Sequence, residues 1–172
     1  MVPKATEDSL KRLILMRHAK SSWKHSGLSD HDRPLNKRGR RDSPSVANHL
    51  SSIGWDPQAV VSSTSQRTRE TWALMAPSWP ESVVVGFEPD LYLGGVSQIV
   101  NTISEMDEAV STLMLLGHNP GWSDAAGWLG GVSTLMTTAN AALLSIEGSS
   151  WSASVSTSGL WDLHEIIRPK NL

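Results

Sequence analysis

The stretch that decides the fold is Leu13–Ala19, which reads LILMRHA. Its first four residues are apolar, and a short run of this kind is typical of a strand buried inside a sheet. The run ends at Arg17 and His18, and the polar loop SSWKHSGLSDHDRP follows over residues 21–34. In an open α/β sheet, ligands bind beyond the carboxyl ends of the strands. The end of this strand is therefore a candidate functional site.

The remainder of the chain alternates short apolar runs with amphipathic segments. The predicted helices start at Asn36, with Pro44 inside, and at Ser65 or Thr64. Further predicted strands span 59–61, 83–85, 113–116, 141–146, 151–155 and 161–167, and predicted helices span 36–52, 65–75, 96–106 and the segment from GHNPGW to about 129. We therefore predict a three-layer α/β/α sandwich, with a mostly parallel central sheet and an antiparallel C-terminal margin.

Length and composition fit one globular domain. The 172 residues are 39% hydrophobic and 19% charged, so we expect a single domain over residues 1–172, with 1–11 as a flexible leader. The chain has no cysteine, which excludes disulfides, thiolate catalysis and sulfur-based metal sites. It shows neither a secretory signal nor an apolar run long enough to span a membrane. We predict a cytoplasmic protein, with an organellar transit peptide as an alternative.

Charge is distributed very unevenly. Residues 1–41 hold 11 basic and 4 acidic residues, a net charge of +7, whereas the rest of the chain carries −9. No lysine or arginine occurs from Thr71 to Ile167. Such a split suggests nucleic-acid binding, a membrane-facing arm or an anion site. The basic cluster at 37–41 has no interleaved aromatic residues, so we expect no nucleic-acid partner and no membrane partner. This cluster could also guide an acidic protein.

Three predicted strand ends carry residues suited to anion chemistry. The first delivers Arg17 and His18, the second the segment SSTSQRTRET with Arg67, and the fourth Gly117-His118-Asn119. The loop after the first strand adds Asp30, Asp32 and Arg33. Guanidinium groups bind phosphate oxygens in a bidentate manner, and a neutral imidazole is a competent nucleophile near pH 7. The set suits phosphoryl transfer without a metal or another cofactor, because the arginines supply the positive charge.

Four motifs in order, LILMRHAKSSW, LSDHDRPLNKRG, SSTSQRTRET and LLGHNPG, resemble the histidine phosphatase (phosphoglycerate mutase-like) superfamily, and in particular its SixA-type phosphohistidine phosphatases. The resemblance covers nearly the whole chain. It implies the same α/β sandwich and makes His18 a nucleophile that forms a phosphohistidine. It also implies that Arg17, Arg33 and Arg67 bind the phosphoryl group and that His118 completes the pocket. The substrate would then be a phosphohistidine on a protein.

Some site predictions and alternatives stay open. Asn119 stands where larger phosphatases place an acid, and Asp30, Asn119 and Trp23 are further candidates for substrate binding. One alternative is a small-molecule phosphomonoesterase that uses Asp30 or Asp32 as its acid. Another is a non-catalytic module that binds phosphate or phosphoproteins. A zinc site at His18, His25 and His31 fits no common ligand spacing. The sequence does not specify the oligomeric state.

Overall fold

The computed structural model describes residues 10–172, which form a six-stranded sheet with the order β3-β2-β4-β1-β5-β6. The strands are β1 (Leu10–Arg17), β2 (Ala59–Ser62), β3 (Val84–Phe87), β4 (Thr112–Gly117), β5 (Ala141–Glu147) and β6 (Asp162–Ile167). Strands β3, β2, β4 and β1 are parallel, whereas β5 is antiparallel to both β1 and β6. The predicted parallel sheet with an antiparallel C-terminal margin is confirmed.

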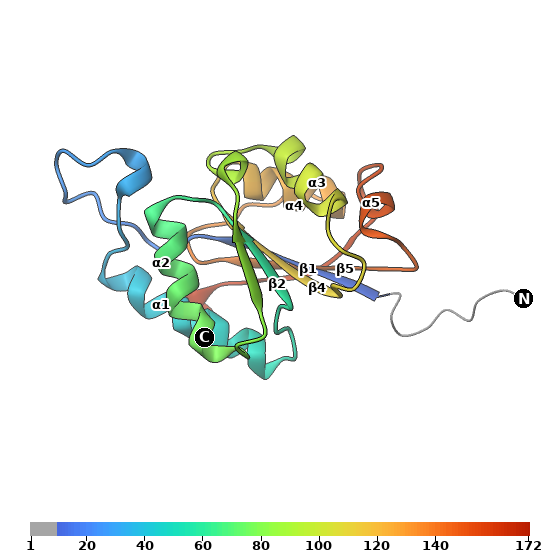
Figure 1. Cartoon of the computed structure of the whole chain (residues 1–172), viewed down its shortest axis with the longest axis horizontal. Helices are drawn as coiled ribbons and strands as arrows, with labels where there is room; N and C mark the ends of the chain where they lie inside the picture. The colour runs from blue at the N-terminus through green and yellow to red at the C-terminus, as the bar shows by residue number, and fades with distance from the viewer. Residues whose placement is uncertain (1–9) are drawn as a thin grey trace, which may run out of the picture.

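Helices cover both faces of the sheet (Figure 1). They are α1 (Lys37–Ser52), α2 (Gln66–Met75), α3 (Val96–Ser104), α4 (Gly121–Gly130) and α5 (Trp151–Ser154), with 3₁₀ turns η2 (Asp30–Asp32), η3 (Ala76–Ser78), η4 (Pro89–Leu91) and η5 (Pro169–Asn171). Ile14 of β1 packs with Leu50 of α1 in one core, whereas its neighbour Leu13 packs with Ile99 of α3 in the other. Alternate strand residues thus fill two cores, and the predicted three-layer architecture is confirmed.

Both N-terminal caps lie where the sequence predicts them. The Asn36 side chain accepts a hydrogen bond from the Gly39 amide at 2.9 Å, and α1 continues through Pro44. Of the two candidate caps for α2, Ser65 is the one used, because its hydroxyl accepts from the Thr68 amide at 3.3 Å. Each side chain satisfies an amide that has no partner inside its helix. The cap at Ser65 fixes where α2 begins at the carboxyl edge of β2.

The prediction of a strand at 151–155 is wrong, because this segment forms α5. The Ser150 hydroxyl caps the helix by accepting from the Ala153 amide at 3.1 Å. Trp151 is fully buried, and its indole donates to the Val110 carbonyl at 2.9 Å and stacks on Trp161. Tertiary anchoring of the tryptophan and the serine cap override the strand preference of these residues.

The predicted leader also needs a correction. Leu10 and Lys11 belong to β1 and pair with β5, so the leader cannot extend to residue 11. The rest of it lies outside the described residues. Within 10–172, no helix is long and apolar enough to cross a membrane.

Candidate active site

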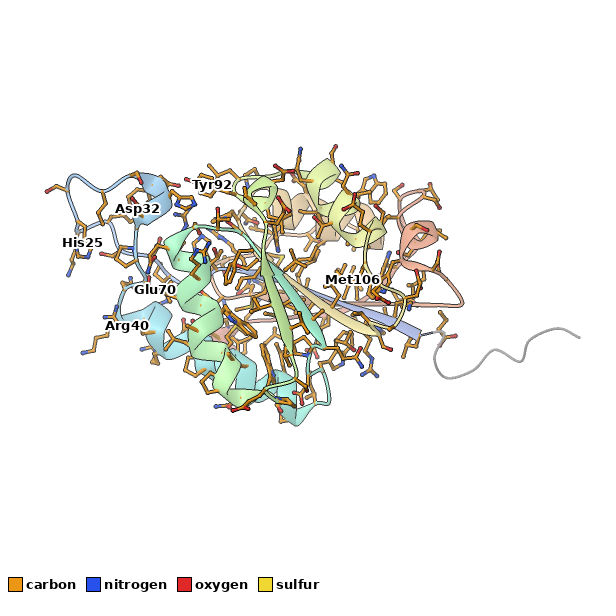
Figure 2. The ribbon with its side chains drawn as sticks, viewed as in Figure 1. His25, Asp32, Arg40, Glu70, Tyr92 and Met106 are labelled. Atoms are coloured by element: carbon orange, nitrogen blue, oxygen red, sulfur yellow. The ribbon has the colours of Figure 1, made fainter. Side chains whose placement is uncertain are left out.

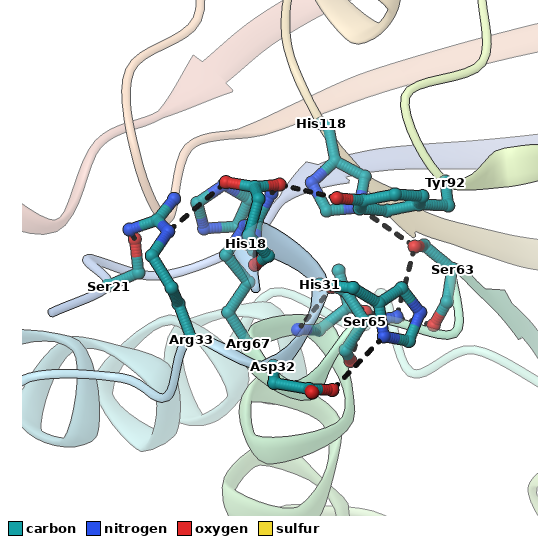
Figure 3. Close-up of polar contacts among 12 residues, drawn as sticks. His18, Ser21, His31, Asp32, Arg33, Ser63, Ser65, Arg67, Tyr92 and His118 are labelled. Carbon is teal, nitrogen blue, oxygen red and sulfur yellow. Dashed lines mark hydrogen bonds and ion pairs between the residues drawn. The ribbon is translucent and has the colours of Figure 1, made fainter. Parts of the chain in front are cut away.

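The register of β1 and β4 brings the two predicted site histidines together. Arg17 pairs with Gly117 at the ends of the two strands, and the His18 amide continues the ladder to the Gly117 carbonyl at 3.0 Å. His18 and His118 follow directly, and their ring centroids are 5.2 Å apart (Figure 3). Both side chains are almost fully buried. Backbone hydrogen bonds between two central strands therefore determine their separation.

Gly117 has a steric role beside this pair. A Cβ at this position would lie 2.1 Å from Cη2 of Trp122. The Trp122 side chain is fully buried, and its indole donates to the Leu115 carbonyl at 3.1 Å. The close approach of this ring to the backbone requires glycine immediately before His118.

His18 has the protonation state of a nucleophile. Its Nδ1 lies 2.7 Å from the Ala19 carbonyl oxygen, which only accepts hydrogen bonds. Nδ1 of the neutral ring therefore carries the proton, and Nε2 keeps its lone pair. Burial lowers the pKa of His18 to about 3, with smaller contributions from Arg67 and Arg17, while the hydrogen bond to Ala19 partly opposes this shift. The ring is neutral at pH 7.

His118 is also held neutral. Burial, with smaller contributions from His18 and Arg67, lowers its pKa to about 3, while Asp30 partly opposes this shift. Its Nε2 is 2.8 Å from the Ser63 hydroxyl, at the end of β2. The Tyr92 ring contacts it edge-on, with centroids 5.4 Å apart. Nδ1 of His118 is buried and has no hydrogen-bond partner among the described residues.

Three arginines predicted to bind a phosphoryl group lie around these histidines. Arg17 ends β1, Arg33 follows the turn η2, and Arg67 lies in the first turn of α2. Arg33 and Arg67 are buried, and burial together with the charge of Arg67 lowers the pKa of Arg17. Arg69 instead stacks on Phe87, with its guanidinium 4.1 Å from the ring centroid, and donates to the Thr64 carbonyl. The structure thus concentrates three positive charges at one edge of the sheet.

The Asp30 carboxylate is bound by two of these arginines. Oδ1 accepts from Arg33 Nε at 3.1 Å, and Oδ2 accepts from Arg67 Nη2 at 3.0 Å and from the Tyr92 hydroxyl. The Tyr92 hydrogen bond and the two arginines hold the pKa of Asp30 well below its usual range. The group is ionised at neutral pH, and it occupies guanidinium donors of Arg33 and Arg67.

Three residues of the site were not predicted from the sequence: Ser63, Tyr92 and His31. The His31 ring docks the loop after β1 onto the β2–α2 turn, with Nε2 2.9 Å from the Thr64 hydroxyl. It also contacts the Tyr92 ring at 4.7 Å, and Figure 2 shows Tyr92 and Asp32 on the same edge of the molecule. Tyr92 is the one tyrosine of the chain and lies five residues beyond β3. The sequence signal that could have identified Tyr92 is its position after a parallel strand, because sites lie beyond the carboxyl ends of such strands.

Two further candidates have different surroundings. Trp23 is 74% exposed, and the Arg33 guanidinium lies 3.5 Å from its ring centroid, so it covers one flank of this arginine. Asn119 is tied into the fold: its Oδ1 accepts from the Ser123 amide and hydroxyl, and its amide donates to the Met136 carbonyl. Most of its hydrogen-bonding capacity is therefore used to join the start of α4 to the segment before β5.

Comparisons with known proteins show which family the chain resembles. Residues 13–91 match the model of the histidine phosphatase superfamily (branch 1). A chloroplast protein of Arabidopsis thaliana of uncharacterised function is 42% identical over 170 residues, covering 92% of this chain and 78% of its own length. An uncharacterised protein of Mycobacterium tuberculosis is 33% identical over 118 residues, which cover 69% of this chain and 72% of the relative.

Solved structures extend the likeness over almost the whole chain. A protein from Nakamurella multipartitia, described under the name phosphohistidine phosphatase SixA, has a TM-score of 0.80 and 27% identity over 93% of this chain and 96% of its own. A SixA structure with bound tungstate has a TM-score of 0.77 and 22% identity, covering 93% of this chain and 98% of that one, and shares the fold. The chain belongs to the histidine phosphatase superfamily. More closely, it has the fold of the small SixA group, and its class of activity is that of a phosphatase.

Proposed function

We propose that the chain removes phosphoryl groups from phosphohistidine on a protein, through a phosphohistidine intermediate at His18. The observation that carries the proposal is the neutral His18 ring, whose Nδ1 is bound by the Ala19 carbonyl and whose Nε2 is free to attack. Nε2 would form a bond to phosphorus while the bond to the substrate imidazole breaks. Water would then attack the phosphohistidine, which releases phosphate and restores His18.

Buried polar atoms support an anionic ligand. Four buried side-chain nitrogens have no hydrogen-bond partner within residues 10–172, and three of them belong to Arg17, Arg67 and His118. An unpaired buried donor costs about 1–3 kcal/mol. A phosphoryl group that displaced Asp30 from Arg67 would bring anionic oxygens to the two arginine donors, and the arginines would stabilise the charge of the transition state.

The state of Asp30 favours a substrate with a good leaving group. An alkoxide must be protonated as it leaves, and the alternative phosphomonoesterase would require Asp30 or Asp32 to hold that proton. Asp30 is ionised because of Tyr92 and Arg67, and the exposed Asp32 lies 3.5 Å from His31 Nδ1. A protonated imidazole leaves without such an acid. The non-catalytic alternative needs the arginines but does not need a nucleophilic histidine beside them.

A labelling experiment tests the proposal. The chain is incubated with ³²P-labelled phosphoramidate, and we expect an acid-labile label on His18 and turnover of a phosphohistidine protein faster than of alkyl phosphates. His18→Ala should abolish the label, whereas His25→Ala, in the exposed loop, should retain it. Normal labelling and turnover by His18→Ala would contradict the nucleophile, and tight phosphate binding without turnover would favour the binding module.

The cellular location is the second part of the proposal. We infer a cytoplasmic protein from the sequence, and the chloroplast name of the plant relative supports the organellar alternative. Fluorescence microscopy of a C-terminally tagged full-length chain separates the two.

A further inference from the structure

A second cluster of positive charge lies outside the active site, around a surface cavity of about 380 Å³. Its walls come from the start of α1, the segment before β5 and the turn η5. Four cationic side chains line it, Arg38, Arg41, Arg168 and Lys170, against one aspartate, Asp42. We call this cavity the basic pocket.

The single aspartate does not neutralise the basic pocket. Asp42 is 7% exposed and is shared between Arg38, at 3.5 Å, and Arg41, at 3.4 Å. Both distances are long for charge-assisted hydrogen bonds. The side chains of Arg38 and Arg41 are 55% and 74% exposed, so their charge faces solvent. The pocket therefore carries net positive charge that is available to a ligand.

The opposite wall is built to hold a cation in place. Asn140 is fully buried and lines the pocket. In the amide orientation that its neighbours require, its Oδ1 accepts from Arg168 Nη1 at 2.6 Å and from the Thr137 amide at 2.9 Å. A buried side chain thus orients Arg168, which also donates to the Leu135 carbonyl. An arginine that served only as a solvated surface charge would not need these hydrogen bonds to hold its side chain in place.

The cations on α1 also stand where they weaken the helix. Lys37, Arg38, Arg40 and Arg41 lie in the first five residues of α1, whose first turn has no acidic residue. The N-terminal end of a helix dipole is positive, so each cation there is unfavourable for the helix. This arrangement is costly for folding, which favours a binding role over a purely structural one.

The basic pocket is joined to the catalytic residues by one short segment, 136–140. The Ala139 amide donates to the His18 carbonyl at 2.9 Å, and the Asn140 carbonyl accepts from the Arg17 amide at 3.0 Å. On the pocket side, Arg38 reaches the Thr138 hydroxyl at 3.5 Å. A polypeptide whose phosphoryl group lies at His18 can therefore contact the pocket with residues a few positions away.

We propose that the basic pocket binds an Asp/Glu-rich segment of the phosphorylated protein substrate. This inference rests on the proposed function, because it assigns a second contact to that substrate. None of the lining residues is aromatic, so the pocket lacks the stacking surface that single-stranded nucleic acids use. The role expected for it is to raise the rate of encounter and the affinity for acidic partners, without changing the chemistry at His18.

The test compares two phosphohistidine peptides, one flanked by Asp and Glu and the other by Asn and Gln, together with free phosphohistidine. For Arg38→Gln with Arg168→Gln we expect a roughly two- to thirtyfold loss of kcat/KM on the acidic peptide, since two rim charges are removed and each contributes modestly. The other two substrates should be unaffected. Arg12→Gln removes one charge at the opposite end of β1 and should leave all three rates unchanged.

A binding measurement separates this inference from the proposed function. Fluorescence anisotropy with the unphosphorylated acidic peptide reports the basic pocket even if no phosphohistidine substrate is turned over. Loss of binding in the double variant supports the pocket whether or not turnover occurs. Equal losses on both peptides, retained binding, or tighter binding of a single-stranded oligonucleotide than of the acidic peptide at the same salt concentration would overturn it.

Discussion

Replacing Asp30 with Asn should increase the affinity of the site for inorganic phosphate. The carboxylate forms ion pairs with Arg33 at 3.1 Å and Arg67 at 3.0 Å, and its side chain is 44% exposed. Ion pairs with a solvent-exposed partner contribute about 0.2–1 kcal/mol each, so two of them oppose an incoming anion by roughly 0.5–2 kcal/mol. At 1.4 kcal/mol for each factor of ten, the dissociation constant should fall about 2- to 30-fold.

Isothermal titration calorimetry with phosphate at pH 7.5 measures this change. Asp32→Asn is the matched control, because it removes the same charge two residues away from a carboxylate that pairs only with His31 among the described residues. If Asp30 competes with the phosphoryl group, only the Asp30 variant gains affinity substantially. Weaker binding in Asp30→Asn would instead mean that the carboxylate holds the arginines in place for the substrate. Equal gains in affinity in both variants would mean that the gain comes only from the loss of one negative charge.

Three further outcomes are expected. The free energy of unfolding should fall by about 2 kcal/mol for each of His18 and His118 between pH 7.5 and 5.0, because the unfolded rings protonate near pH 6.5 and the folded ones only near 3. In urea titrations, His18→Gln should lose roughly half as much stability over this pH range as the unsubstituted chain. A stability that does not change with pH would contradict two histidines that stay neutral in the fold. Ser63→Ala should cost about 1–3 kcal/mol by leaving His118 without its hydrogen bond, measured by thermal unfolding, and should lower kcat. Gly117→Ala should destabilise the fold by about 3 kcal/mol through the clash with Trp122, whereas Gly86→Ala, with open space around its Cβ, should change the melting temperature little.

Helices and central strands were predictable where local chemistry and packing agree. Asn36 and Ser65 offer side-chain acceptors at the starts of amphipathic segments, and the apolar runs at β1 and β4 are fully buried. The helix at Trp151 was not predicted, because its residues favour a strand. It is held in place by contacts with Val110 and Glu108, which lie more than 40 positions away in the sequence.

The site was predictable to the extent that strand ends determine it. His18, His118, Arg17 and Arg67 each lie at or just after the end of a parallel strand, and sheet topology alone brings them to one edge. The pairing of Asp30 with the arginines depends instead on the path of the loop after β1. This loop brings the Asp30 carboxylate to Arg67, which lies 37 positions further along the chain.

The paired backbone of β1 and β4 fixes the two histidines independently of the loop beside them. The distance between the histidines is a property of paired backbone in the buried centre of the sheet, whereas Arg33, Asp30 and Trp23 all belong to one surface segment. Insertions, deletions and substitutions in that segment can change the surroundings of His18 and His118 while the spacing of the two rings is preserved. The histidine pair and the loop beside it can therefore vary independently of each other.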